Sequence, residues 1–218
     1  MSKSSSAALL FMLAGLACDA AAQTAGTCVP VSERKGRALG CYIIARQVIP
    51  ELPRAPLYWH LDAYPDAKAA QAAKGPNGTV VESYGKIWVF TIATKGSRPA
   101  TAARVAEIGP LPVVSAKEYV AAYTEGTYKP GNKSDVHHHP GAETWHIIEG
   151  EICVETPTGK RVQRAGDPNV IVPGGVPMQV TASGTQMRRA IVLVLQDAAQ
   201  PRSAPASDWK PKGLCATP

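Results

Sequence analysis

Three residues near the middle of the chain have the types and the spacing of a metal site. His137 and His139 are separated by one residue, and Glu143 follows four residues later. Alternate side chains of an extended strand share a face, so the two imidazoles are predicted to point together and His138 away from them. The Pro140–Gly141 turn is predicted to return Glu143 on the next strand. Two imidazoles and one carboxylate with open positions suit Fe(II), and the mixed donors also suit Mn, Ni, Cu or Zn.

The protonation of the two imidazoles is predicted to control metal binding. Histidine binds metal as the neutral ring, so the affinity should fall as the pH drops through the histidine range. The other histidines are not assigned to this site. His146 lies on the opposite face of its strand from Glu143 and is expected to contact the outside. His60 is interpreted as a hydrogen-bonded surface histidine.

The segment that carries these residues has the pattern of a barrel. From residue 116 to residue 197, short strand-like runs alternate with turns at a spacing of roughly ten residues, as in a sandwich or barrel. Ala190–Leu195 is wholly apolar and is predicted to be a central strand. Residues 198–218 are rich in Ala, Pro and Ser and are predicted to form an irregular tail.

The preceding part of the chain, residues 23–115, is predicted to be an extension packed on the barrel. Residues 57–63 alternate like a strand, and residues 79–84 and 86–94 are predicted to be two further strands. Residues 65–74 are rich in alanine and are predicted to form one short helix. The predicted fold class is therefore all-β, with extra strands and one short helix added to the barrel.

Residues 1–22 have the pattern of a secretory signal peptide. Ala7–Ala17 is an apolar run too short to span a bilayer, and Ala20–Ala22 supplies small residues before a cleavage site. Gln23 is then the predicted first residue of the mature protein. The protein is predicted to be exported to the periplasm or the extracellular space, without a stable membrane anchor.

Export changes the interpretation of the cysteines. Four of the five remain after cleavage, and an oxidising compartment favours disulfides between them. A bridge between Cys28 and Cys41 is favoured and would close a short loop. Two interpretations stay open for Cys153: it pairs with Cys215 and fixes the tail to the barrel, or it is a small buried hydrophobe.

The composition limits the size and the partners of the protein. The chain has 218 residues, of which 45% are hydrophobic, which is enough for one domain with extensions. The net charge is +6, but the basic residues are scattered, and their densest cluster, Glu33–Arg37, contains an acid. A nucleic-acid surface usually needs a basic stripe, so no nucleic-acid partner is expected. A basic face can instead assist contact with an anionic surface or substrate.

The histidine segment resembles the first motif of the cupin superfamily. Gly131, His137, His139, Glu143 and Gly150 stand at the spacing Gly-x5-His-x-His-x3-Glu-x6-Gly, which matches that motif at its defining positions. The downstream segment 166–178 resembles the second motif. The resemblance covers residues 116–197 and implies a jelly-roll barrel. It also implies pairing of two copies into a homodimer.

The second motif departs from the family pattern at one position. Cupins with a full metal site usually have His where this chain has Met178. A thioether is a soft ligand and a poor match for Fe(II) or Mn(II). The resemblance thus implies a reduced site of His137, His139 and Glu143, with Trp145 and Met178 as residues that line the pocket.

The same resemblance implies a function without choosing a reaction. A divalent metal at the site would activate a bound small molecule or O₂, in a dioxygenase, isomerase or lyase reaction. Two alternatives stay open. One is a metal-free pocket that binds a small molecule, with Met178 and Trp145 as its apolar lining. The other is a structural exported domain with a relic motif.

Overall fold

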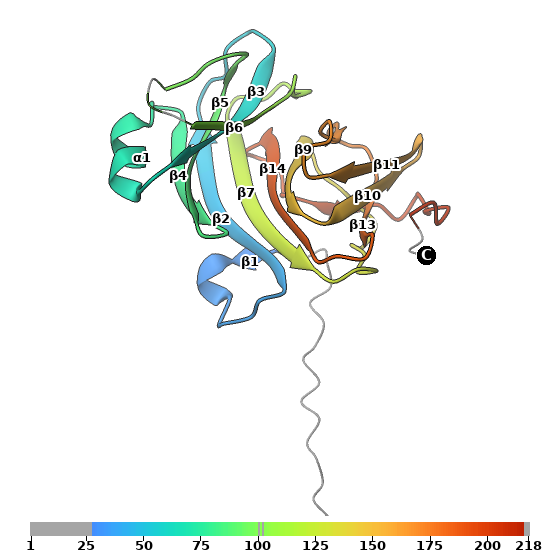
Figure 1. The fold of residues 1–218 in the computed structure, drawn as a ribbon. Coiled ribbons are helices and arrows are strands. Elements are labelled where there is room, and N and C mark those ends of the chain that lie inside the picture. The colour runs from blue at the N-terminus through green and yellow to red at the C-terminus, as the bar shows by residue number, and fades with distance from the viewer. Residues whose placement is uncertain (1–27, 100, 102, 216–218) are drawn as a thin grey trace, which may run out of the picture.

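The structure is a computed structural model that describes residues 28–99, 101 and 103–215. The predicted signal peptide, residues 1–22, lies outside the described residues. The described chain is built mainly from strands, which form stacked sheets (Figure 1). Among the described residues, no helix is long and apolar enough to cross a membrane.

The central layer is a six-stranded sheet. Its strands, in spatial order, are β1 (Val29–Pro30), β2 (Gly40–Ile49), β7 (Tyr119–Tyr128), β14 (Arg188–Asp197), β9 (Ala142–Glu149) and β12 (Ile171–Val172). A short 3-10 helix, Val31–Glu33, follows β1. β2 pairs with β7 along its length, so a strand of the N-terminal extension is part of the same sheet as the barrel strands.

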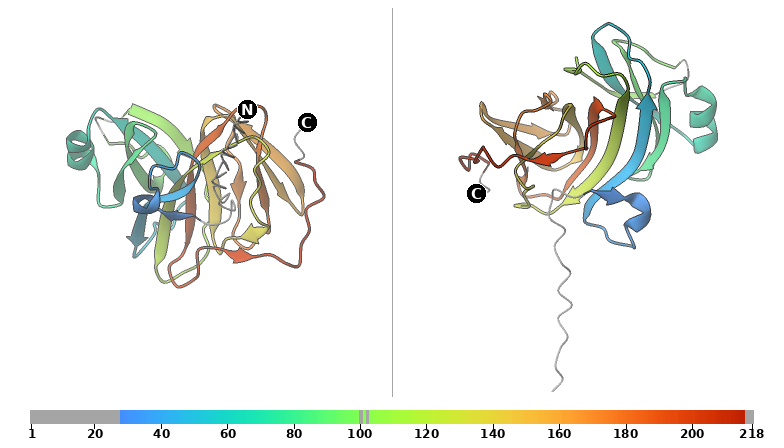
Figure 2. Two further views of the ribbon diagram at one scale, coloured as in Figure 1. Left: turned by 90° about the horizontal axis from the view of Figure 1, so that it is seen from below. Right: turned by 180° about the vertical axis from the view of Figure 1, so that it is seen from behind.

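Two smaller sheets complete the barrel on one face of this layer. One consists, in spatial order, of β11 (Gly159–Arg164), β10 (Glu151–Thr156) and β13 (Gln179–Ser183). The other pairs β15 (Ala204–Pro205) with β8 (His137–His138). The two sheets lie on the same side of the central layer in both views of Figure 2. The predicted all-β jelly-roll barrel is therefore confirmed.

The N-terminal extension forms a separate layer on the opposite face. Its sheet consists, in spatial order, of β4 (Gly78–Ser83), β5 (Lys86–Thr94), β3 (Leu57–Tyr64) and β6 (Ala103–Ile108). The helix α1 (Ala67–Ala73) covers the outer side of this sheet (Figure 1). The Asp66 side chain caps α1 by accepting a 2.8 Å hydrogen bond from the backbone N–H of Ala69.

The apolar strand β14 lies between the two cores, as its sequence predicts. Ile191, Leu193 and Leu195 pack against the N-terminal sheet, in the cluster that contains Trp59 and Phe90. Ala190 and Val192 point the other way and pack inside the barrel. A strand that is buried on both faces needs apolar residues at nearly every position, which explains why it shows no alternation.

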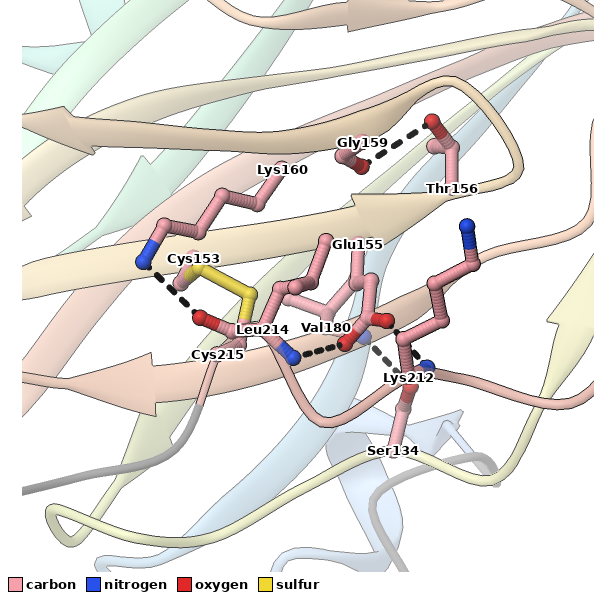
Figure 3. The surroundings of a disulfide bond; sticks show 10 residues. All are labelled: Ser134, Cys153, Glu155, Thr156, Gly159, Lys160, Val180, Lys212, Leu214 and Cys215. Carbon is pink, nitrogen blue, oxygen red and sulfur yellow. Dashed lines mark hydrogen bonds between the residues drawn. A yellow bond between two sulfur atoms is a disulfide. The ribbon is translucent and has the colours of Figure 1, made fainter.

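The described cysteines form two disulfides, Cys28–Cys41 and Cys153–Cys215. The first bridge confirms the pairing that the sequence favours. The second shows that Cys153 pairs with Cys215 and is not a free buried thiol. Figure 3 shows how the second bridge holds the C-terminal segment on the barrel. The buried Glu155 carboxylate also accepts hydrogen bonds from the backbone N–H groups of Lys212 and Leu214.

The structure corrects the prediction that His60 is a surface histidine. The ring is hydrogen-bonded as expected, but it is fully buried and not at the surface. It lies on the face of β3 away from the main core, where Asp62, Arg104 and Glu107 surround it. The polar face of β3 is not a surface, because side chains of the paired strand β6 form hydrogen bonds and ion pairs with it.

Candidate metal centre

Two neighbouring strands and a tight turn bring the three predicted ligands together. His137 is on β8, His139 follows it, and Glu143 is on β9. The turn between them passes so close to β14 that a Cβ atom on Gly141 would overlap the backbone carbonyl of Leu195. Glycine is therefore required for this close approach.

The ligand atoms of His137, His139 and Glu143 all lie within 4.8 Å of one another. His139 and Glu143 are buried, and the two imidazole rings lie 5.0 Å apart between centroids at an angle of 84°. His138 is only half-buried and is not in the group. The structure thus brings together the three residues that the spacing singled out.

Backbone carbonyls fix the orientation of both rings. Nδ1 of His137 lies 2.8 Å from the carbonyl oxygen of Asp135, and Nδ1 of His139 lies 2.5 Å from that of Arg202. Each Nδ1–H donates to its carbonyl, which leaves Nε2 of each ring available to a metal. Metal-binding histidines usually have such a partner on the other nitrogen, because it sets the tautomer and the ring orientation.

The Glu143 carboxylate is suited to bind a cation together with the Nε2 atoms of the two rings. Its Oε2 atom is buried and accepts no hydrogen bond from the described residues, although it lies 3.4 Å from Nε2 of His139. Buried polar atoms are rarely left without a partner. A metal ion between the two rings and this oxygen would supply one, so the donor set fits a divalent metal.

The Glu143 carboxylate and the His139 imidazole shift each other's pKa. Burial favours the neutral acid of Glu143, but His139, His137 and Arg202 together outweigh it and lower the pKa of Glu143. Burial likewise opposes a charged His139, but the Glu143 carboxylate and the Arg202 carbonyl together outweigh it and raise the pKa of His139. Burial lowers the pKa of His137, an effect that Glu143 only partly offsets. His137 is thus held in the neutral form that binds metal.

A cavity of about 50 Å³ opens beside the three ligands. It lies inside the barrel, and the residues that line it include Tyr128, Trp145, Arg188 and Arg202. Trp145 is one of the two residues proposed from the sequence to line the pocket.

Met178, the other one, lies directly across from His137. The two backbones exchange hydrogen bonds, with N···O distances of 2.8 and 3.1 Å. The Met178 side chain packs with Trp145 and Ile147 in the apolar cluster of the barrel. The described residues that line the cavity do not include it.

Sequence analysis did not identify Arg188 or Arg202 as part of the site. A signal existed for Arg188, because Arg188 and Arg189 begin a strand that is buried on both faces. Adjacent strand residues point to opposite faces, so one of the two arginines has to point into the barrel. Arg202 had no local signal, since it lies in the segment predicted to be an irregular tail.

The strand order and the positions of the two motifs are those of a cupin-type jelly-roll barrel. The first motif places His137 on β8, His139 just after it and Glu143 on β9. The second motif runs through β12 to Met178, opposite His137. Both motifs therefore face the inside of one jelly-roll barrel. The barrel has the cupin superfamily fold.

Comparison with solved structures also returns proteins of this fold. An uncharacterised protein with a double-stranded beta-helix domain from Klebsiella pneumoniae is 24% identical over 39% of this chain and 70% of its own, with a TM-score of 0.35. A cupin-like protein from Thermotoga maritima is 17% identical over 43% of this chain and 66% of its own, with a TM-score of 0.36.

A DMSP lyase from Ruegeria pomeroyi is 22% identical over 43% of this chain and 45% of its own, with a TM-score of 0.35. The chain therefore matches less than half of that lyase. No protein-family model and no curated protein matches the sequence. The strand order and the motif positions, and not these neighbours, define the fold of the barrel.

Proposed function

We propose that this chain binds a divalent metal ion through Nε2 of His137, Nε2 of His139 and the carboxylate of Glu143, and that it holds a small molecule beside the metal. One observation carries the proposal: the three ligand atoms lie within 4.8 Å of one another beside a cavity inside the barrel. A metal with three protein ligands keeps open positions for a bound molecule.

The surroundings of the ligands support this proposal. Both rings are oriented by backbone carbonyls, and Oε2 of Glu143 has no hydrogen-bond partner within the described part of the chain. A divalent metal here would act as a Lewis acid toward an oxygen of the bound molecule. The residues of the chain would orient that molecule and exclude water, with Trp145 as an apolar part of the wall.

The size of the cavity limits the bound molecule. A volume of about 50 Å³ holds on the order of three to five water-sized groups. The proposed ligand is therefore a molecule with few non-hydrogen atoms, unless the wall moves. We also propose that the protein acts outside the cytoplasm, because its two disulfides would persist in an oxidising compartment.

Metal content tests the proposal directly. The full chain is expressed with export and without a histidine tag, stripped with a chelator, and reconstituted separately with Fe(II), Mn(II), Zn(II) and Cu(II). We expect wild type to retain about one equivalent of at least one metal, and the double variant His137→Ala with His139→Ala to retain almost none. His138→Ala is the matched control, because it removes the middle histidine of the three and leaves the proposed ligands unchanged.

The proposal fails if wild type and the double variant retain equally little of every metal. That result would favour the metal-free pocket. The proposed metal site would also be refuted if His138→Ala lost as much metal as the double variant. Metal binding would then not depend on the three ligands described above.

A further inference from the structure

Arg188 is a buried cation that forms no ion pair with a carboxylate among the described residues. It is the first residue of β14, its exposed fraction is 7%, and it lines the cavity beside the three ligands. Its Nε atom is buried and has no hydrogen-bond partner among the described residues. The guanidinium lies over the ring of Tyr128, with Cζ 4.6 Å from the ring centroid.

The adjacent Arg189 differs from Arg188 in exposure and in ion pairing. Its side chain points out of the barrel, is 49% exposed, and lies 3.4 Å from the Glu149 carboxylate. Within the part of the chain that the structure describes, Arg188 has the aromatic contact but no comparable ion pair. Burial lowers the pKa of Arg188, which reflects the unfavourable desolvation of its charge.

The cavity as a whole has an excess of positive charge. A second arginine, the partly buried Arg202, lines it, and the buried Nε atom of this residue also lacks a partner among residues 28–99, 101 and 103–215. The cavity wall contains one carboxylate, that of Glu143, against these two guanidinium groups. In the proposed function that carboxylate binds the metal, which adds further positive charge.

The chemistry of a guanidinium defines what would balance this charge. Its planar N–H donors match the two oxygens of a carboxylate or a similar oxyanion, and the pairing is strongest where water is excluded. Tyr128 holds the guanidinium from one side, so little side-chain entropy is lost when an anion binds.

We propose that Arg188 binds the anionic group of a small ligand, so that the molecule held at the metal is a small carboxylate or a related oxyanion. This inference rests on the proposed metal function, whose ligands are separate residues. It names the class of molecule that the cavity would select and the residue that would select it.

Anion binding to the Co(II)-loaded full chain tests the inference. Acetate is titrated while the visible absorption of Co(II) is followed, and acetamide, which has a similar shape and no charge, is the ligand control. We expect acetate to bind wild type and Arg189→Gln with equal affinity, and Arg188→Gln to bind it about tenfold or more weakly. Acetamide should bind weakly to all three proteins.

The measured Co(II) content separates the two proposals. If Arg188→Gln holds as much Co(II) as wild type and binds acetate equally well, the anion site is refuted and the metal site stands. If wild type holds neither Co(II) nor any of the four metals of the first experiment, the proposed function fails, and the anion site is tested by the rise in Tm of the metal-free protein in acetate. An equal rise in wild type and Arg188→Gln, or no rise in wild type, would refute it.

A second variant guards against loss of folding. Arg188→Lys keeps the charge but lacks the planar pair of donors, so we expect a folded protein with acetate affinity between wild type and Arg188→Gln. If Arg188→Gln does not fold, the acetate affinity of Arg188→Lys is compared with that of wild type instead. Wild-type acetate affinity in a folded Arg188→Lys would then refute recognition by the guanidinium.

Discussion

The carbonyl oxygen of Arg202 lies 2.5 Å from Nδ1 of His139, a residue 63 positions earlier in the chain. A segment outside the cupin motifs thus orients one of the proposed metal ligands. This segment is held by the disulfide between Cys153 and Cys215, by Glu155 and by the pairing of β15 with β8. The integrity of the metal centre is therefore expected to depend on the C-terminal segment.

Removal of the disulfide should weaken metal binding as well as stability. For the double variant Cys153→Ser with Cys215→Ser, we expect a loss of about 4 kcal/mol in the free energy of unfolding, because the bridge closes a long loop. Metal affinity should fall about tenfold, since the partner of His139 is no longer fixed. Chelator competition and urea unfolding measure the two effects.

A destabilised variant with an intact tail is the control for this prediction. Leu61→Ala removes a buried side chain of the N-terminal layer and leaves the C-terminal segment unchanged. If Leu61→Ala weakens metal binding as much as the double cysteine variant does, lower stability is the cause and the tail has no specific role.

Met178→His should strengthen the metal site. Met178 and His137 exchange two backbone hydrogen bonds, and residues paired in this way place their side chains on the same face of a sheet. The metal-free variant should be less stable by about 1–3 kcal/mol, because a polar ring replaces an apolar side chain in the barrel. The metal-induced rise in Tm should exceed that of wild type. An unchanged rise would mean that the new imidazole does not reach the metal.

His60 should make stability depend on pH. Nδ1 of His60 lies 2.8 Å from the Arg104 guanidinium and must accept its hydrogen bond, while Nε2–H donates to the carbonyl of Thr94 at 3.0 Å. Burial, and then the charge of Arg104, lower the pKa of His60. The unfolded chain therefore binds a proton more readily than the folded protein does.

The sign of the effect follows from this difference. The contribution of neutral His60 is complete above a pH of about 6.5, the unfolded value, and is lost as the pH falls from there through the lower folded pKa. His60→Gln should flatten the dependence of the unfolding free energy on pH in this acidic window, whereas the control His138→Gln should leave it unchanged. Urea unfolding at several pH values measures the slope, and an unaltered slope in His60→Gln would contradict the prediction.

The two layers should unfold together. Leu61 belongs to the N-terminal sheet, but it packs in the same cluster as Leu193 of the barrel sheet. Leu61→Ala should cost about 2–5 kcal/mol, and circular dichroism and the release of bound metal should shift to lower urea by the same amount. Val105→Ala, at a position 42% exposed on β6, should change stability by less than about 0.5 kcal/mol. Metal release at an unchanged urea concentration in Leu61→Ala would show that the barrel is stable on its own.

Local patterns in the sequence determined the fold class and the proposed metal ligands. The spacing of His137, His139 and Glu143, with a turn between the second and the third, places these groups on two successive strands and the segment that joins them. Strand periodicity likewise predicted β3, β5 and the central position of β14. These features depend on residues close together in the chain, so a local pattern is sufficient to predict them.

The tertiary structure alone decided the surroundings of those ligands. It placed Arg202 against His139, placed Arg188 in the wall of the cavity, and buried His60 among charged neighbours. It also chose between the two interpretations of Cys153. Each of these outcomes depends on strands and segments far apart in the sequence. Burial and electrostatic environment are properties of the assembled layers, and no single segment carries them.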